Sequence, residues 1–192
     1  MRKILTSLMI IAVLAASITA GAMAVFTDQQ TNPDNVFTTG TVILGIDPAT
    51  AMFTVSNMAP GDVEYGGLEV TNDGSLELRY AMTTTADDTS TLDEQLDLTI
   101  DVVTGPGADT QWYTDDDVVG EANIYGPDGV LSSALFGNPV TGNHTGDRTL
   151  ASSASERLRF TATLPLDTDN SYQGTNCTVA FVFDAEQTAN NS

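Results

Sequence analysis

The feature that most constrains the fold is a series of short segments in which apolar side chains alternate with polar ones. A period of two is the pattern of a β-strand with one buried face. The apolar positions are Val42, Leu44 and Ile46; Leu76, Leu78, Tyr80 and Met82; Leu98, Ile100 and Val102; Leu158, Phe160, Ala162 and Leu164; and Val179, Phe181 and Phe183. Turn-forming sequences separate them, at Asp47-Pro48, Ala59-Pro60-Gly61-Asp62, Asn72-Asp73-Gly74, Gly105-Pro106-Gly107, Gly126-Pro127-Asp128-Gly129 and Asn138-Pro139. Short strands at such intervals predict an all-β protein, a two-sheet antiparallel β-sandwich of jelly-roll or immunoglobulin type.

Helical patterns are short. Ser90 precedes the run Thr91 to Leu96 as a plausible N-cap, with Glu94 near the capping-box position, which predicts one or two helical turns. A second short helix is predicted from Val130 to Phe136. Neither is long enough to organise the fold, so the prediction is a jelly-roll-like antiparallel β-sandwich with one or two short helices.

The first 24 residues have the order of a secretory signal peptide. Arg2 and Lys3 are followed by an uncharged run from Ile4 to Thr19 and by an Ala-x-Ala site formed by Ala22 and Ala24. We expect signal peptidase to cut between Ala24 and Val25. A retained membrane anchor is the alternative, but the run is shorter than the ~20 apolar residues of a spanning helix. The predicted parts are thus a signal helix at 1–24, an N-terminal segment at 25–40 and one domain at 41–192.

The chain after Ala24 is extremely acidic. It holds all 26 Asp and Glu residues against four arginines and no lysine, a formal net charge of −22. Self-repulsion at this charge destabilises a compact state in dilute buffer and is screened by concentrated salt, which predicts a salt-loving host. Nucleic acids and anionic membranes are excluded as partners, because both require basic side chains.

Residues for catalysis are scarce. His144 is the only histidine and lies in a loop sequence, whereas a zinc protease of the usual kind needs two histidines one helical turn apart. No enzymatic activity is therefore predicted. Asp115, Asp116 and Asp117 form a candidate calcium site, since calcium takes loop oxygens as ligands, and a solvated acidic surface is the alternative. No other cofactor is expected.

Three asparagines are glycosylation candidates in an exported chain: Asn143, Asn176 and Asn190, each in an Asn-x-Ser/Thr sequence. Cys177 is the only cysteine, which excludes an intrachain disulfide. By alternation it shares a face with Val179 and Phe181, so a buried, unreactive thiol is predicted there.

Three blocks of sequence resemble the TasA/camelysin family of exported fibre subunits, which includes archaeal bundling pilins. The first covers Ala24 to Asp28 and Asn35 to Leu44, at and after the predicted cleavage site. The second covers Asn57 to Asp62, with its Pro-Gly-Asp turn, and Leu68 to Leu76, with its Asn-x-Gly-Ser-Leu sequence. The third covers Ser171 to Gly174 and Val179 to Gln187. The middle of the chain, from about Ala86 to Arg157, shows little likeness.

The resemblance implies a jelly-roll subunit that forms a homopolymer outside the cell by donor-strand complementation, as a cell-surface filament or biofilm matrix fibre that joins cells. Val25, Phe26 and Thr27 would then be the donor-strand anchors, with Phe26 filling a groove in the neighbour, and Asp28 to Asn35 would be a tether. Removal of the leader would permit assembly, and no membrane contact would remain after processing. An ordinary first strand in its own sheet is the alternative for this segment.

Two other functions stay open. A secreted acidic sandwich could be a binding module for calcium, carbohydrate or a surface-layer protein. The camelysin name also implies a metalloendopeptidase, from which the absence of a zinc-ligand sequence departs.

Overall fold

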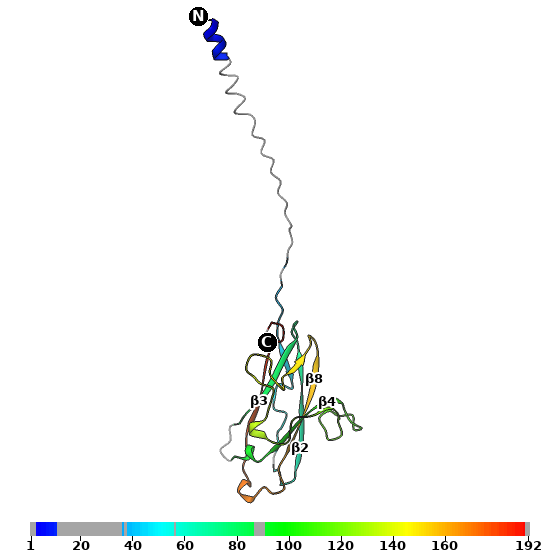
Figure 1. Ribbon diagram of the computed structural model, residues 1–192. Coiled ribbons are helices and arrows are strands. Elements are labelled where there is room, and N and C mark those ends of the chain that lie inside the picture. Colours follow the sequence, from blue (N-terminus) through cyan, green and yellow to red (C-terminus); the bar gives the residue numbers. More distant parts are fainter. Residues whose placement is uncertain (1–2, 11–35, 37, 56, 87–90, 191–192) are drawn as a thin grey trace. The chain divides into compact units, whose positions relative to one another are not determined.

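The computed structural model describes residues 3–10, 36, 38–55, 57–86 and 91–190 (Figure 1). The chain divides into two units, Met1–Thr38 and Thr39–Ser192. In the first unit, residues 3–10 are helical. Among the described residues, no helix has the length and apolar character that crossing a membrane requires. The predicted cleavage residues Ala22, Ala24 and Val25 and the predicted anchors Phe26 and Thr27 lie outside the described residues.

The second unit is the predicted antiparallel β-sandwich. The larger sheet, here sheet A, has five strands in the order β1-β2-β8-β4-β5. Their bounds are Leu44–Asp47 (β1), Val63–Asn72 (β2), Ser155–Thr163 (β8), Asp97–Gly105 (β4) and Val118–Val130 (β5). Every neighbouring pair in it is antiparallel.

The smaller sheet, sheet B, is built around β3 (Leu78–Ala86). One edge of β3 pairs along its full length with β9 (Val179–Gln187). The other edge pairs with two short strands, β6 (Leu135–Phe136) and β7 (Arg148–Leu150). Sheet B is therefore only three strands wide, opposite the five strands of sheet A.

The core lies between the two sheets, where the alternation predicted it. The fully buried side chains include Val70 from β2, Leu78, Tyr80 and Met82 from β3, Leu98 and Ile100 from β4, and Leu158 and Phe160 from β8. The alternating segments around Leu44, Leu78, Leu98, Leu158 and Val179 are all strands, so these predictions are confirmed.

Four strands were not predicted, the long strands β2 and β5 and the short strands β6 and β7. β6 lies within the range 130–136 that was predicted as a helix. β2 was missed although it has a neighbouring strand on each side in sheet A, and β5 continues through Gly126-Pro127-Asp128-Gly129, which was predicted to break the chain. β5 can include this sequence because it is the edge strand of sheet A and is irregular, with four register shifts against β4.

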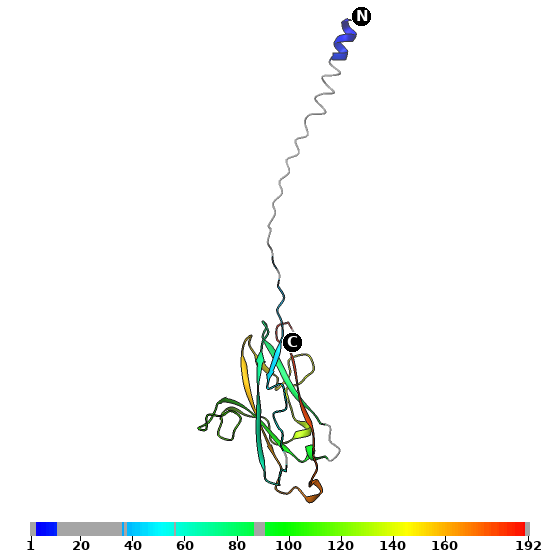
Figure 2. The same cartoon turned by 180° about the vertical axis from the view of Figure 1, so that it is seen from behind.

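Within the second unit, the described helices are single 3-10 turns: η1 (Leu92–Glu94), η2 (Leu131–Ser133) and η3 (Asn170–Tyr172). The first two fall where short helices were predicted, but the second ends early because β6 begins at Leu135. Between β4 and β5 a long arm, residues 106–117, projects from the sandwich in both ribbon views (Figure 2).

Candidate functional site

The outer edge of β9 has no strand beside it among the described residues. Its nine residues pair with β3 in an unbroken register, from Val179 opposite Ala86 to Gln187 opposite Leu78. Every second side chain of β9 points toward the core, and these residues, Val179, Phe181, Phe183 and Ala185, are only half-buried. A regular, uncovered edge with apolar side chains at its inner face can bind another extended chain.

The position of β9 relative to sheet A follows from the contacts of β6 and β7, which pair with the other edge of β3. The η2 turn before β6 is joined to the start of β4 by a hydrogen bond from Leu131 N–H to the Leu96 carbonyl (2.8 Å). Arg148 of β7 bonds Glu121 of β5 at 3.1 Å. Since β6 and β7 lie against the β4–β5 side, β9 lies on the side of β1.

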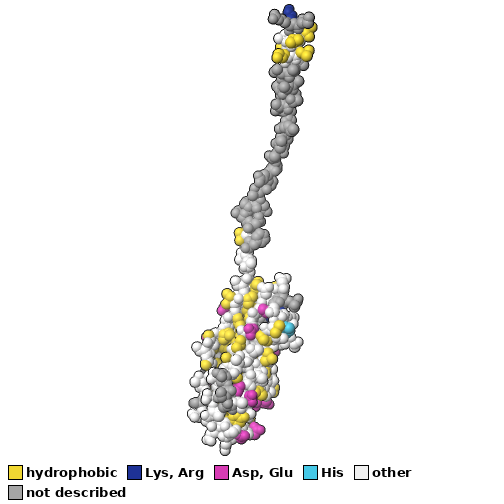
Figure 3. All heavy atoms as spheres, turned by 90° about the vertical axis from the view of Figure 1, so that its left-hand side faces the viewer, with side chains coloured by type: hydrophobic (Ala, Val, Ile, Leu, Met, Phe, Trp, Pro, Cys, Tyr) yellow, Lys and Arg dark blue, Asp and Glu magenta, His cyan; other side chains and the backbone are white. Residues whose placement is uncertain are grey.

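Apolar side chains of β1 and of the segment after it pack against the core but are half-buried rather than buried. Leu44 and Ile46 come from β1, and Met52 and Phe53 from the segment after it. Phe53 packs against the bare backbone at Gly66, where a Cβ would stand 3.0 Å from its ring. Phe160, opposite Gly66 in the register, contacts Phe181 of β9 with ring centroids 4.9 Å apart. We call this region, bounded by β1 and the outer edge of β9, the open side. Figure 3 shows hydrophobic side chains in a band along one face of the domain.

The two edges of sheet A are protected in ways that β9 is not. β1 has only four residues and is followed directly by Pro48, which has no N–H to donate to a new strand. β5 carries four register shifts, which disturb the regular row of backbone groups that a new strand needs. β9 has neither a proline nor a register shift.

The first residues of the domain are fixed at the turn between β2 and β3. The carbonyl of Thr41 accepts hydrogen bonds from the N–H groups of Ser75 and Leu76, both at 3.1 Å, and Asp73 N–H donates to the Ile43 carbonyl at 2.9 Å. At Gly40 a Cβ would stand 2.4 Å from Leu76, so glycine permits this close packing. We call these contacts between residues 40–43 and 73–76 the root.

Asn72 holds the root turn in place from inside. Its side chain is fully buried and makes three hydrogen bonds: Nδ2 donates to the carbonyls of Leu76 (2.8 Å) and Leu150 (2.9 Å), and Oδ1 accepts from Gly74 N–H (3.0 Å). At Gly74 a Cβ would stand 2.5 Å from the Thr41 carbonyl. The sequence Asn72-Asp73-Gly74-Ser75-Leu76 therefore joins β2, β7 and the start of the domain.

A comparison with known protein families finds a match to the N-terminal part of the chain. Residues 1–104 match the model of the camelysin metallo-endopeptidase family, a range that contains the predicted signal peptide, the root and the strands up to β4. The chain belongs to the TasA/camelysin family. A search of curated proteins finds no match. Of the three blocks of resemblance, the first two fall inside the matched range, and the third, which contains β9, falls outside it.

The camelysin name implies a catalytic metal, and the described residues do not fit one. Among them, no three His, Cys, Asp or Glu side chains gather as metal ligands. His144 lies in the loop between β6 and β7, half-buried rather than exposed as its loop sequence suggests, and its Nε2 has no hydrogen-bond partner. The nearby carboxylate of Asp147 accepts bonds from the N–H groups of His144 and Asn138, both at 2.8 Å. We therefore derive no metal-dependent step for this camelysin-family chain.

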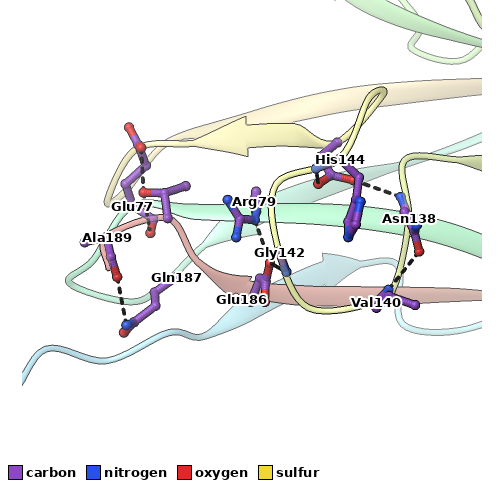
Figure 4. A network of polar contacts seen from close by, with 11 residues as sticks. Glu77, Arg79, Asn138, Val140, Gly142, His144, Glu186, Gln187 and Ala189 are labelled. Carbon is purple, nitrogen blue, oxygen red and sulfur yellow. Dashed lines mark hydrogen bonds and ion pairs between the residues drawn. The ribbon is translucent and has the colours of Figure 1, made fainter. Parts of the chain in front are cut away.

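That loop, residues 137–147, lies against β3 and β9 (Figure 4). Glu186 of β9 accepts from Gly142 N–H (2.8 Å) and pairs with Arg79 of β3 (2.6 Å). These contacts cover part of sheet B, and in the part of the chain that the structure describes they leave the outer edge of β9 without a partner strand. On the inner face of sheet B, burial raises the pKa of Tyr80, and the charge of Glu156 raises it further. The Tyr80 hydroxyl donates a hydrogen bond to the Glu156 carboxylate.

Each of the four arginines after Ala24 is paired with a carboxylate. Besides Arg79 and Arg148, Arg157 pairs with Glu69 and Arg159 with Asp101, both at 2.8 Å. Arg159 and Asp101 are each only 9 % exposed. These pairs were not predicted from the sequence. The pattern that could have indicated them is an arginine that alternates with buried residues, as in Arg157-Leu158-Arg159-Phe160. The remaining surface charge of the domain is therefore predominantly negative.

The structure places the candidate calcium residues at the base of the β4–β5 arm, where their oxygens bond the arm itself. Asp116 accepts from Ala108 and Asp109 N–H and from the Thr114 hydroxyl, and Asp117 from Tyr113 and Thr114 N–H. The Thr114 bond, with help from the two backbone N–H groups, lowers the pKa of Asp116. Asp115 is exposed, and its carbonyl accepts from Arg159. Calcium binding by these three residues stays a prediction.

Asn143, Asn176 and Asn190 are all exposed, as a glycan acceptor must be, and glycosylation stays a prediction. Cys177 shares the inward row of β9, as predicted. It is half-buried at the margin of the core, so the prediction of a buried thiol was too strong.

Proposed function

We propose that this chain is the structural subunit of an extracellular fibre, assembled by donor-strand complementation, in which the segment Val25 to Thr31 of one subunit pairs with the outer edge of β9 in the next. The observation that carries the proposal is the uncovered edge of β9 beside half-buried apolar side chains. The family supports it, and so does the mismatch in width between the two sheets.

Two contributions to the free energy would favour binding of the donor segment to β9. A seven-residue partner would form roughly six or seven backbone hydrogen bonds along β9, each worth ~0.5–1.5 kcal/mol net. Burial of the Phe26 side chain would add about 1.5–3 kcal/mol. Before the leader is removed, Val25 and Phe26 are joined to a membrane-directed segment, so cleavage would release the donor strand for assembly.

We further propose a location and a role for the protein after its leader is removed. The processed protein would be secreted and held in a surface filament, where it joins cells in a biofilm matrix. The protein would have no enzymatic activity. A protease assay of the purified chain with and without a chelator tests this last point, and chelator-sensitive cleavage would contradict it.

The decisive experiment compares the chain that starts at Val25 with one that starts at Asn32. We expect fibres from the first by electron microscopy and monomers from the second on a sizing column. Cys177 offers a second readout, because a donor strand beside β9 would slow reaction of this half-buried thiol with a maleimide.

A peptide of residues 25–39 provides the matched control. Added to the shortened chain, it should slow the reaction of Cys177 and raise the melting temperature, whereas the same peptide with Phe26→Asp should do neither. Fibres of normal appearance from the shortened chain would refute N-terminal donation. If the chain that starts at Val25 stayed monomeric, the result would favour the alternative that the protein is a binding module.

A further inference from the structure

The root fixes the point at which the N-terminal segment joins the domain. Thr41 and Ile43 are bonded to the turn 73–76, and Gly40 is packed against Leu76. β9 ends at the same place: Thr188, the residue after β9, donates its N–H to the Glu77 carbonyl (3.2 Å) and its hydroxyl to the Glu77 carboxylate (2.7 Å) (Figure 4). The root therefore lies at the Gln187 end of β9, and Val179 marks the far end.

We propose that the donor segment of one subunit runs antiparallel to β9 of the next, with its Thr31 end toward Cys177 and its Val25 end toward Gln187. This inference rests on the proposed function and adds the direction of the strand. In a fibre of subunits stacked head to tail, the root of one subunit faces the Val179 end of the next. The donor segment then enters at that end and extends toward Gln187. Because β9 runs from Val179 to Gln187, the two strands point in opposite directions, as every pair in sheet B already does.

The same geometry disfavours a closed monomer. A segment that turned back into its own β9 directly from the root would run parallel to it, which is the slightly less stable pairing. Antiparallel insertion into the same domain would need about seven residues to return along a seven-residue strand and about four more for the turn. Only eight residues, 32–39, separate the donor segment from the packed Gly40. Donation to a neighbour is therefore the arrangement that the root favours.

Two engineered cysteine pairs test the direction. By alternation, Gln30 would face the same way as Phe26. Cys177, two residues before β9, and Ala185, near the end of β9, both pack against the core on the inner side. These two positions are eight residues apart, about 26 Å along a strand. A disulfide forms only where the two Cα atoms lie within about 7 Å. The first variant is Gln30→Cys with the natural Cys177, and the second is Gln30→Cys, Ala185→Cys and Cys177→Ser.

Both variants are assembled, oxidised with a copper catalyst and separated on a denaturing gel without reductant. We expect a ladder of disulfide-linked subunits from the first variant, at least tenfold stronger than from the second. Gln29→Cys with Cys177 is the matched control, since its side chain would face away from the open side, and it should give little ladder.

The other possible outcomes of the cross-linking experiment would contradict different parts of the proposal. A stronger ladder from the Ala185→Cys variant would show parallel insertion and overturn the direction. A cross-linked monomer would show self-insertion and overturn the argument from the root. Fibres without cross-links in either variant would remove β9 as the acceptor. An unmodified chain that forms no fibres at all would refute the proposed function itself.

Discussion

Asn72→Ala should destabilise the domain far more than an ordinary asparagine substitution. The side chain is fully buried, and its removal leaves the Leu150 carbonyl and the Gly74 N–H in buried positions without their partners. Each buried polar group left unpaired costs ~1–3 kcal/mol, so the two together predict a loss of about 4 kcal/mol. For a domain of this size the loss corresponds to a fall in melting temperature of roughly 8–16 °C.

The measurement is urea unfolding followed by fluorescence of Trp112, the only tryptophan, in a chain that starts at Asn32 so that assembly does not interfere. Asn170→Ala is the matched control, because Asn170 is exposed, and it should change the free energy of unfolding by less than about 0.5 kcal/mol. A loss below about 1 kcal/mol for Asn72→Ala would refute the reasoning, since the root turn would then hold without the buried amide.

Three further predictions concern charge. Asp101→Asn should cost about 3–5 kcal/mol in urea unfolding, because it leaves Arg159 buried without its ion-pair partner; a loss near zero would show that water replaces the carboxylate. Asp97→Asn should raise the melting temperature at pH 7, because burial, then the charges of Asp128 and Asp167, raises the pKa of Asp97 in the folded state. The charged form is therefore penalised by folding at neutral pH, and the benefit of the substitution should vanish at about pH 3, below the unfolded pKa; an equal benefit at both pH values would contradict this cause. Lowering the salt concentration should reduce the melting temperature of the whole domain, because unscreened repulsion grows at a net charge of −22; a melting temperature insensitive to salt would contradict the salt-loving host.

The strands that could be predicted from the sequence are those whose alternation is carried by large side chains, such as Leu78, Tyr80 and Met82 in β3. β2 was missed because Gly66 and Gly67 interrupt its alternation. Both glycines are required by packing, since Phe53 lies over Gly66 and a Cβ at Gly67 would meet the ring of Tyr113. β5 was missed for the opposite reason: most of it is exposed, so it carries little apolar pattern at all.

The open side could not be predicted from local pattern. Val179, Phe181 and Phe183 alternate in the same way as Leu158 and Phe160, yet the former lie at an edge and the latter in the middle of a sheet. Whether a strand has one neighbour or two depends on pairings between residues far apart in the chain. The family resemblance pointed to Phe26 as a donor, and the pairing of β9 supplies the candidate acceptor.

The acidic surface narrows the ways in which copies of this chain can associate. Attraction between opposite charges is a poor basis for self-association here, because every arginine after Ala24 is already paired within the subunit. Carboxylates visible on one face gather toward one end of the domain, while the apolar band runs along it (Figure 3). The inward row of β9, from Val179 to Ala185, contains no charged residue, and the backbone groups along its outer edge carry no net charge. On the acceptor side, pairing through this edge therefore places uncharged groups at the contact, where repulsion would be most costly, and leaves the carboxylates of β9 outside the inward row.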